Sequence, residues 1–159
     1  MTSFFSSHLN SLPLCLLLAV FLLPISIIDL RTQRIPPVLS IGLLVAGLAF
    51  AWLPGGLSPL QSFIGAVAGG GALFLVALIG EKLSGREDAM GGGDIKLMAG
   101  IGSCIGPWLV LPVLATASFM ALAFVLLTWK QGIRGRKIVF GPFLAFGTAF
   151  AFFIARLIQ

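Results

Sequence analysis

Apolar runs follow one another along most of this chain, and only short polar stretches separate them. Hydrophobic residues make up 58% of the 159 residues and charged residues only 9%, against about 25% in ordinary soluble domains. So few charged groups cannot cover the surface of a water-soluble globule. The composition therefore predicts an all-α polytopic membrane protein, with residues 1–159 forming a single transmembrane domain.

The apolar runs predict a bundle of about six transmembrane helices. Pro24 lies within the first run, where membrane helices tolerate proline, and a proline–glycine turn signal at 54–56 ends the second. The third run contains Gly65 and Gly69 in a G-x-x-x-G pattern followed by two more glycines, which predicts a close helix-packing face. The predicted spans are residues 11–30, 38–53, 61–80, 94–105, 108–129 and 140–157.

The fourth span is short, about 18 Å at ~1.5 Å per residue against a hydrocarbon core of ~30 Å. If it crosses the membrane, nine of the ten Lys and Arg residues share one face. If it does not cross, the basic loop 130–137 falls on the opposite face. The positive-inside rule favours the first arrangement, with both termini outside and the charged loops cytoplasmic. The net charge of +5 therefore reflects topology and not a nucleic-acid partner.

Two of the five acidic residues fall at predicted cytoplasmic ends of helices. Asp29 closes the first span and Asp94 opens the fourth, so we expect both at the same depth. A carboxylate at membrane depth is costly and is by default a functional group. Two that meet form a dyad in which one activates water and the other polarises a carbonyl group. The alternatives are neutralisation of Asp29 by Arg31 or Arg34, and an ion relay.

Three glycines lead into Asp94, and a lysine follows it. Glycine permits positive φ and close approach of another backbone, so Gly91, Gly92 and Gly93 are expected to let a substrate or helix approach the carboxylate. The structural alternative is a loop in which Asp94 caps the following helix, since Asp is a favoured N-cap. Lys96 either holds one carboxylate ionised or extends its ammonium group to lipid phosphates.

Other binding residues are few, and neither a metal nor a cofactor is expected. Cys15 and Cys104 lie far apart with no C-x-x-C pattern, and His8 is the single histidine. Glu87 and Asp88, in the polar loop before the glycines, are more easily solvated than Asp29 and Asp94.

Three motifs, in order, resemble those of the type IV prepilin peptidase family, which are membrane aspartyl proteases of the GxGD type. Residues 91–97 (GGGDIKL) resemble the family's G-x-G-D-x-K-L signature, and residues 29–36 (DLRTQRIP) its first-aspartate motif. Residues 140–145 (FGPFLA) resemble the tract that opens its last helix. The resemblance covers nearly the whole chain and implies a six-helix core in which Asp29 and Asp94 are the catalytic pair.

Members of that family are multi-pass proteins of the bacterial inner (cytoplasmic) membrane. They remove the short basic leader of prepilins or pseudopilins, used in type IV pili and type II secretion, at the cytoplasmic face. Some also methylate the new N-terminus and carry an insert with paired C-x-x-C motifs, which this chain lacks, so the resemblance implies the short, peptidase-only form. Glu87 and Asp88 would then attract the leader, and Phe140-Gly141-Pro142 would pack against the site. Pro37 departs from the usual Asn or Asp, but proline fits a first helical turn.

A non-enzymatic membrane protein is the competing hypothesis, either a proton-coupled transporter or an assembly scaffold of a pilus or secretion machine. A transporter should show paired broken helices near the midplane and often an internal repeat. Here both aspartates are expected near one face, and no repeat relates the two halves. A scaffold that has lost its chemistry would not need both aspartates and the glycines. The sequence therefore favours a peptidase, while the pilin class that it cuts and its oligomeric state stay open.

Overall fold

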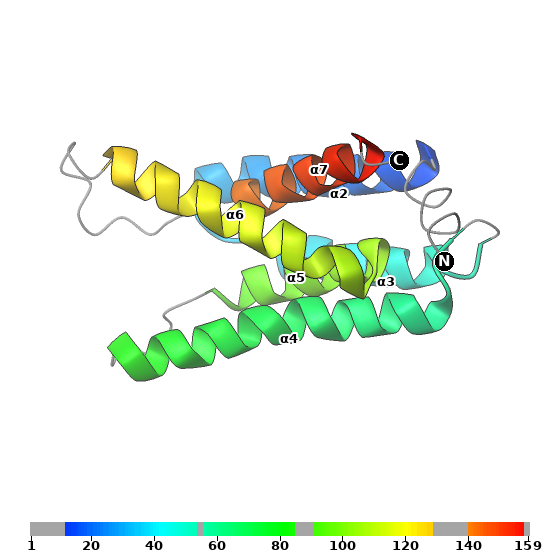
Figure 1. Cartoon of the computed structure of the whole chain (residues 1–159), viewed down its shortest axis with the longest axis horizontal. Helices are drawn as coiled ribbons and strands as arrows, with labels where there is room; N and C mark the ends of the chain where they lie inside the picture. The colour runs from blue at the N-terminus through cyan, green and yellow to red at the C-terminus, as the bar shows by residue number, and fades with distance from the viewer. Residues whose placement is uncertain (1–11, 54–55, 85–90, 129–139, 158–159) are drawn as a thin grey trace.

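The structure, a computed structural model, describes residues 12–53, 56–84, 91–128 and 140–157, most of which form α-helices (Figure 1). Three of the helices, α2, α4 and α6, are long and apolar enough to cross a membrane. The expectation of an all-helical membrane protein is therefore supported. The helices are α2 (Leu12–Thr32), α3 (Pro37–Phe50), α4 (Pro59–Ser84), α5 (Gly92–Ile105), α6 (Pro107–Thr128) and α7 (Gly141–Leu157).

Proline and glycine mark several of the helix boundaries. Helix α2 continues through Pro24 without interruption. Pro37 is the first residue of α3, where a missing N–H costs no helical hydrogen bond. A tight turn at Gly106-Pro107 separates α5 from α6, because Gly106 adopts a φ of 76° just after α5 and α6 starts at the next residue. Such a φ suits glycine and strains most other residues.

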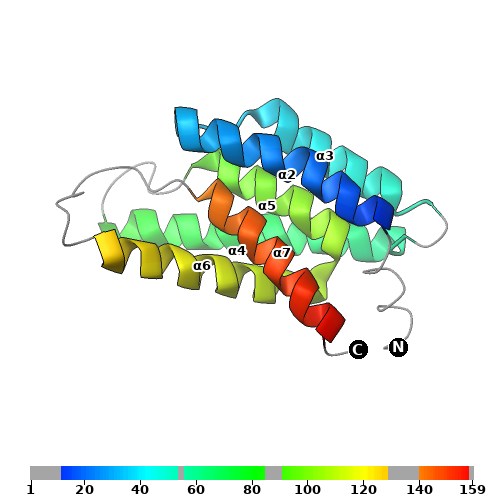
Figure 2. The ribbon, with the colours of Figure 1, turned by 90° about the horizontal axis from the view of Figure 1, so that it is seen from above.

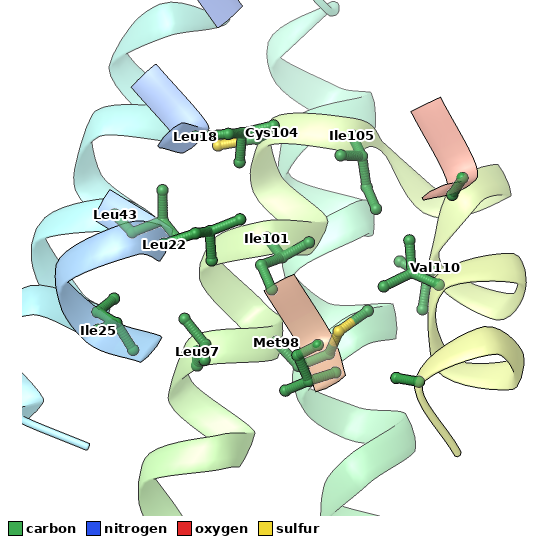
Figure 3. Packing of buried hydrophobic residues seen from close by; sticks show 14 of the residues in the cluster. Leu18, Leu22, Ile25, Leu43, Leu97, Met98, Ile101, Cys104, Ile105 and Val110 are labelled. Carbon is green, nitrogen blue, oxygen red and sulfur yellow. The ribbon is translucent and has the colours of Figure 1, made fainter. Parts of the chain in front are cut away.

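Helix α5 lies at the centre of the bundle. From Leu97 to Ile105 nearly all of its residues are buried, although it is only 14 residues long. Side chains from α2, α3 and α6 surround it, as Figure 3 shows for Leu22, Leu43 and Val110. The short α5 is therefore enclosed by the other helices over most of its length.

Helices α4 and α5 approach each other at backbone distance because glycines face each other. A Cβ atom on Gly65 would overlap the carbonyl oxygen of Gly102, and a Cβ on Gly102 would overlap that of Gly65. A Cβ on Gly69 would lie 2.5 Å from the Met98 carbonyl oxygen. The G-x-x-x-G packing face predicted from the sequence is thus confirmed, and its partner is α5.

The same interface continues on either side of these contacts. Gly70 faces Ala99, whereas Gly71 faces open space and takes no part in the packing. The Ser62 hydroxyl donates a 2.7 Å hydrogen bond to the buried carbonyl oxygen of Ser103. Together, the small residues and this hydrogen bond fix the antiparallel register of α4 against α5.

That register shows how far α4 extends past Asp94. Since Gly65 faces Gly102 and Gly69 faces Met98, Leu73 lies at the level of Asp94. Helix α4 continues from there to Ser84, another 11 residues, or ~16 Å at 1.5 Å per residue. Figure 1 shows this end of α4 extending beyond the start of α5.

The helices form two groups, and each predicted aspartate belongs to a different one. Helices α3 and α4 pack extensively on α5, whereas α7 packs on α6 and α2 (Figure 1). From above, α7 runs obliquely between α2 and α6 (Figure 2). Direct contact between α2 and α5 is limited. Asp29 on α2 and Asp94 on α5 therefore meet where the two groups join.

Candidate active site

Asp29 lies in the last turn of α2 and is buried, with only 4% of its surface exposed. Its Oδ2 atom accepts a 3.0 Å hydrogen bond from the backbone N–H of Gly141, the first residue of α7. The first amides of a helix have no partner within the helix and carry a partial positive charge. Asp29 is unfavourably placed at the C-terminus of α2, but it caps the N-terminus of α7.

The sequence also allowed neutralisation of Asp29 by a neighbouring arginine. Arg31 and Arg34 are both exposed. The hydrogen-bond partner that the described residues provide for Asp29 is the Gly141 amide. The structure therefore favours burial against α7 over an arginine ion pair.

Asp94 is the third residue of α5 and not its N-cap, so the predicted capping role is wrong. The helix begins at Gly92, and Gly91 occupies the cap position without a side-chain hydrogen bond. The glycines continue the helix two residues further back than the apolar run indicated. Asp94 is consequently a partly buried side chain of the first helical turn.

The two carboxyl groups are close enough for the negative charge of Asp29 to act on Asp94. Asp94 lies within the first turn of α5, and Asp29, although it belongs to the last turn of α2, accepts from the first amide of α7. A helix N-terminus carries the equivalent of about +0.5 elementary charge. Two converging N-termini offset part of the repulsion between two acidic groups and stabilise negative charge at this position.

Of the three glycines before Asp94, Gly93 makes the close contact. A Cβ atom on Gly93 would lie 2.9 Å from the Cβ of Ile35, whereas one on Gly92 would meet nothing. A Cβ on Gly91 would make an ordinary 3.5 Å contact with Asp94 Oδ2. None of the three has positive φ. A close contact is thus found at Gly93, with Ile35 of the turn after α2 as the partner, whereas the approach of a substrate or helix to Asp94 stays a prediction.

The turn after α2 brings Ile35 to this position. Gln33 has a φ of 53°, in the left-handed region that closes many helices, and its N–H donates to the Asp29 carbonyl oxygen at 2.8 Å. The Thr32 hydroxyl lies within hydrogen-bond distance of the Ile28 and Arg34 carbonyl oxygens. This turn connects Asp29 directly to the segment that packs on the start of α5.

Lys96 points away from Asp94. Two residues along an α-helix correspond to a rotation of about 200°, and the Lys96 side chain is exposed. Its face of α5 is continued by Gly100, which packs on Leu43 of α3, and by Ser103. Of the two roles expected for Lys96, extension toward lipid phosphates agrees with this geometry, and direct support of a carboxylate does not.

Replacing Lys96 by Gln should therefore leave the activity of the site within about threefold of wild type. The substitution removes a positive charge that lies on the far side of α5 and breaks no contact of either aspartate. Substrate turnover in membranes, normalised to the amount of folded protein, checks this. A loss of turnover of a hundredfold or more would show that Lys96 acts directly in the site.

The remaining residues singled out in the sequence, Glu87 and Asp88, lie outside the described part of the chain, so their expected contact with a substrate stays a prediction. Among the residues that the structure does describe, no group of three or more His, Cys, Asp or Glu side chains is arranged to hold a metal ion.

Sequence reasoning missed the direct contact that Gly141 makes with Asp29. The motif at 140–145 was expected only to pack against the site, and Phe140 does pack against the core. A backbone N–H gives no residue-specific signal, and 112 positions separate the donor from its acceptor. The glycine just before Pro142 is the one hint that a close approach is needed here.

An apolar helical protein that brings two aspartates together at converging helix ends is a membrane protein with a carboxylate-pair site. A family model described as the type IV leader peptidase family matches residues 16–126 of this chain. The chain belongs to that family. The match includes Asp29, Asp94 and the glycines before Asp94, and it ends before α7.

Curated relatives agree with this assignment. The prepilin leader peptidase/N-methyltransferase of Pectobacterium carotovorum subsp. carotovorum is 35% identical over 139 residues, which are 85% of this chain and 49% of that protein. Proteins of the same name from Neisseria gonorrhoeae and Escherichia coli (strain K12) are 38% and 37% identical, over 81% and 80% of this chain and 44% and 57% of their own lengths. The chain thus spans about half the length of these relatives. No solved structure matches it.

Proposed function

We propose that this protein is a membrane aspartyl endopeptidase that removes the short basic leader of prepilins or pseudopilins. The observation that carries the proposal is the meeting of Asp29 and Asp94 at the junction of the two helix groups. Family membership and the printed names of the relatives support the same activity. The proposal concerns peptidase activity alone, because the chain has two cysteines and no paired C-x-x-C motifs.

The proposed reaction uses both carboxyl groups of the site. One aspartate, ionised, takes a proton from a water molecule as the water oxygen bonds to the carbonyl carbon of the scissile peptide. The other, protonated, donates to the carbonyl oxygen, and the nitrogen of the leaving chain takes up a proton as the C–N bond breaks. The helix N-termini at α5 and α7 stabilise the negative charge that this cycle keeps in the site.

The proposed topology has six crossings, with both termini outside and the site at the cytoplasmic face of the bacterial inner membrane. The end of α2 and the starts of α5 and α7 lie at one end of the bundle (Figure 1). The basic residues Arg31, Arg34 and Lys82 belong to the same end. An excess of Lys and Arg at one end supports a cytoplasmic orientation for it.

We further propose that the substrate helix lies in the membrane beside the bundle while its basic leader extends into the cytoplasm. Glu87 and Asp88, in the loop between α4 and α5, would then attract the leader. This attraction would weaken as the salt concentration rises, because exposed charges are screened.

The test is leader removal in membranes of a bacterium without a prepilin peptidase of its own. The protein is co-expressed in turn with a type IV pilin, a tight-adherence pilin, a type II secretion pseudopilin and a competence pilin. Mass spectrometry then gives the N-terminus of each product. Wild type is expected to shorten at least one substrate, while the double variant Asp29→Asn, Asp94→Asn leaves every substrate intact.

Two outcomes count against the proposal. If the double variant trims a substrate as fast as wild type, another protein is the protease. If wild type, folded and in the membrane, trims none of the four substrates, the peptidase reading is wrong. Proton flux across liposomes that contain the protein would then test the transporter alternative.

A further inference from the structure

The first residue of α7 is a glycine for a reason that lies outside α7. A Cβ atom on Gly141 would lie 2.5 Å from Oδ2 of Asp29 and 3.3 Å from its Cγ. The φ of Gly141 is not positive, so the backbone itself would accept alanine. The absent side chain is therefore required by the Asp29 carboxyl group and not by the helix.

The hydrogen bond between these residues distinguishes the two oxygens of Asp29. A backbone N–H can only donate, so Oδ2 must act as the acceptor at 3.0 Å, whatever the protonation state of the group. A proton on Asp29 is therefore favoured on Oδ1, because the hydroxyl oxygen of a carboxylic acid accepts hydrogen bonds more weakly than its carbonyl oxygen. In the reaction proposed above, Oδ1 is then the oxygen that exchanges a proton with water or with the substrate.

We propose that Gly141 is a positioning residue of the active site, and that the N-terminus of α7 fixes the orientation of the Asp29 carboxyl group. Three features serve this role together: the donor N–H, the missing Cβ, and the placement of both at the start of a helix. The inference rests on the proposed function, because it names the residue that holds one of the two proposed catalytic aspartates.

The competing interpretation is that Asp29 merely caps α7 and stabilises the bundle. A capping role predicts that disturbing the contact lowers stability, by about 1 kcal/mol in typical caps. A positioning role predicts that it lowers the catalytic rate constant at unchanged stability. A misplacement of about 1 Å in an active site can cost around 10²-fold in rate.

Gly141→Ala separates these interpretations, with Gly71→Ala as the matched control because a Cβ at Gly71 meets nothing. For Gly141→Ala we expect kcat for leader removal to fall between about tenfold and a hundredfold, while KM and the thermal unfolding midpoint stay near wild type. Gly71→Ala should match wild type in kcat and KM. An unchanged kcat in Gly141→Ala would overturn the proposal, and so would a loss of kcat that is accompanied by an equal loss of folded protein.

A second measurement needs no turnover and uses a variant that preserves the shape of the site. In protein labelled with ¹⁵N-glycine, the Gly141 amide proton should resonate downfield, because its acceptor is a carboxylate. In Asp29→Asn it should move upfield, while the Gly71 amide stays in place. An unmoved Gly141 resonance would overturn the contact itself. If wild type cleaves no prepilin, the proposed function fails, yet this spectrum still decides whether α7 holds Asp29.

Discussion

Asp94→Asn is expected to lower the rate of leader removal by roughly 10²–10⁴-fold, the usual contribution of a general acid or base. The substitution replaces a partly buried carboxyl group of the first turn of α5 with an amide of nearly the same shape. Because the fold does not depend on the titratable proton, the thermal midpoint should stay within a few degrees of wild type. Single-turnover cleavage of a purified prepilin in detergent micelles measures the rate.

The matched variant is Asp29→Asn, for which we expect a loss of the same size. Asparagine retains a side-chain oxygen that can accept the Gly141 N–H, so the start of α7 keeps its partner. Asp94→Glu is the informative control, since it retains a carboxyl group but displaces it by one methylene group, and an intermediate rate is expected. If either single asparagine variant keeps more than about a tenth of the wild-type rate, the two carboxyl groups do not act as the pair of general acid and base proposed here.

Gly102→Ala should destabilise the protein by separating two helix backbones that are in contact. The new Cβ would overlap the Gly65 carbonyl oxygen and lie 2.8 Å from its carbonyl carbon. Backbone atoms cannot rotate away as a side chain can, so α4 and α5 must separate. Overpacking of this kind typically costs about 1–3 kcal/mol. We expect a clear fall in the thermal midpoint of the detergent-solubilised protein.

Gly71→Ala is the control for this comparison as well. Gly71 belongs to the same glycine-rich part of α4 as Gly69 and Gly70, but a Cβ there would face open space. There the alanine should leave stability unchanged or raise it by about 0.5–1 kcal/mol, the usual gain over glycine inside a helix. Equal midpoints for Gly102→Ala and Gly71→Ala would show that the close contact between α4 and α5 does not hold the bundle together.

The sequence predicted correctly the features that depend on a single helix: a residue pattern repeated along it, or a residue at one of its ends. The small residues Gly65 and Gly69 recur at a helical spacing, so their packing face could be found without knowing its partner. The pairing of Asp29 with Asp94 could be expected because each interrupts an apolar run at the same predicted depth. Both inferences need only the period of a helix and the dimensions of a bilayer.

The features that it could not predict depend on how helices far apart in sequence meet. Capping was the structural alternative for Asp94 because an apolar run begins after it, but two glycines extend α5 in the other direction. Lys96 follows Asp94 by two residues and was therefore a candidate partner, although the helix turns it to the opposite face. The Gly93 contact with Ile35 required the left-handed turn at Gln33, which no local preference of glutamine indicates.

The long end of α4 would set a minimum length for a leader that binds at the proposed site. Asp94 lies level with Leu73, and α4 continues for ~16 Å beyond it. An extended peptide advances ~3.3 Å per residue, so about five residues are needed to reach from the carboxyl pair to the end of that helix. For the proposed reaction, a leader shorter than this would hold its basic groups beside the apolar residues 74–79 of α4, before Glu81 and Lys82, and a longer one would carry them past Ser84 into water. The length of a leader, and not only its charge, would then decide which precursors are cut.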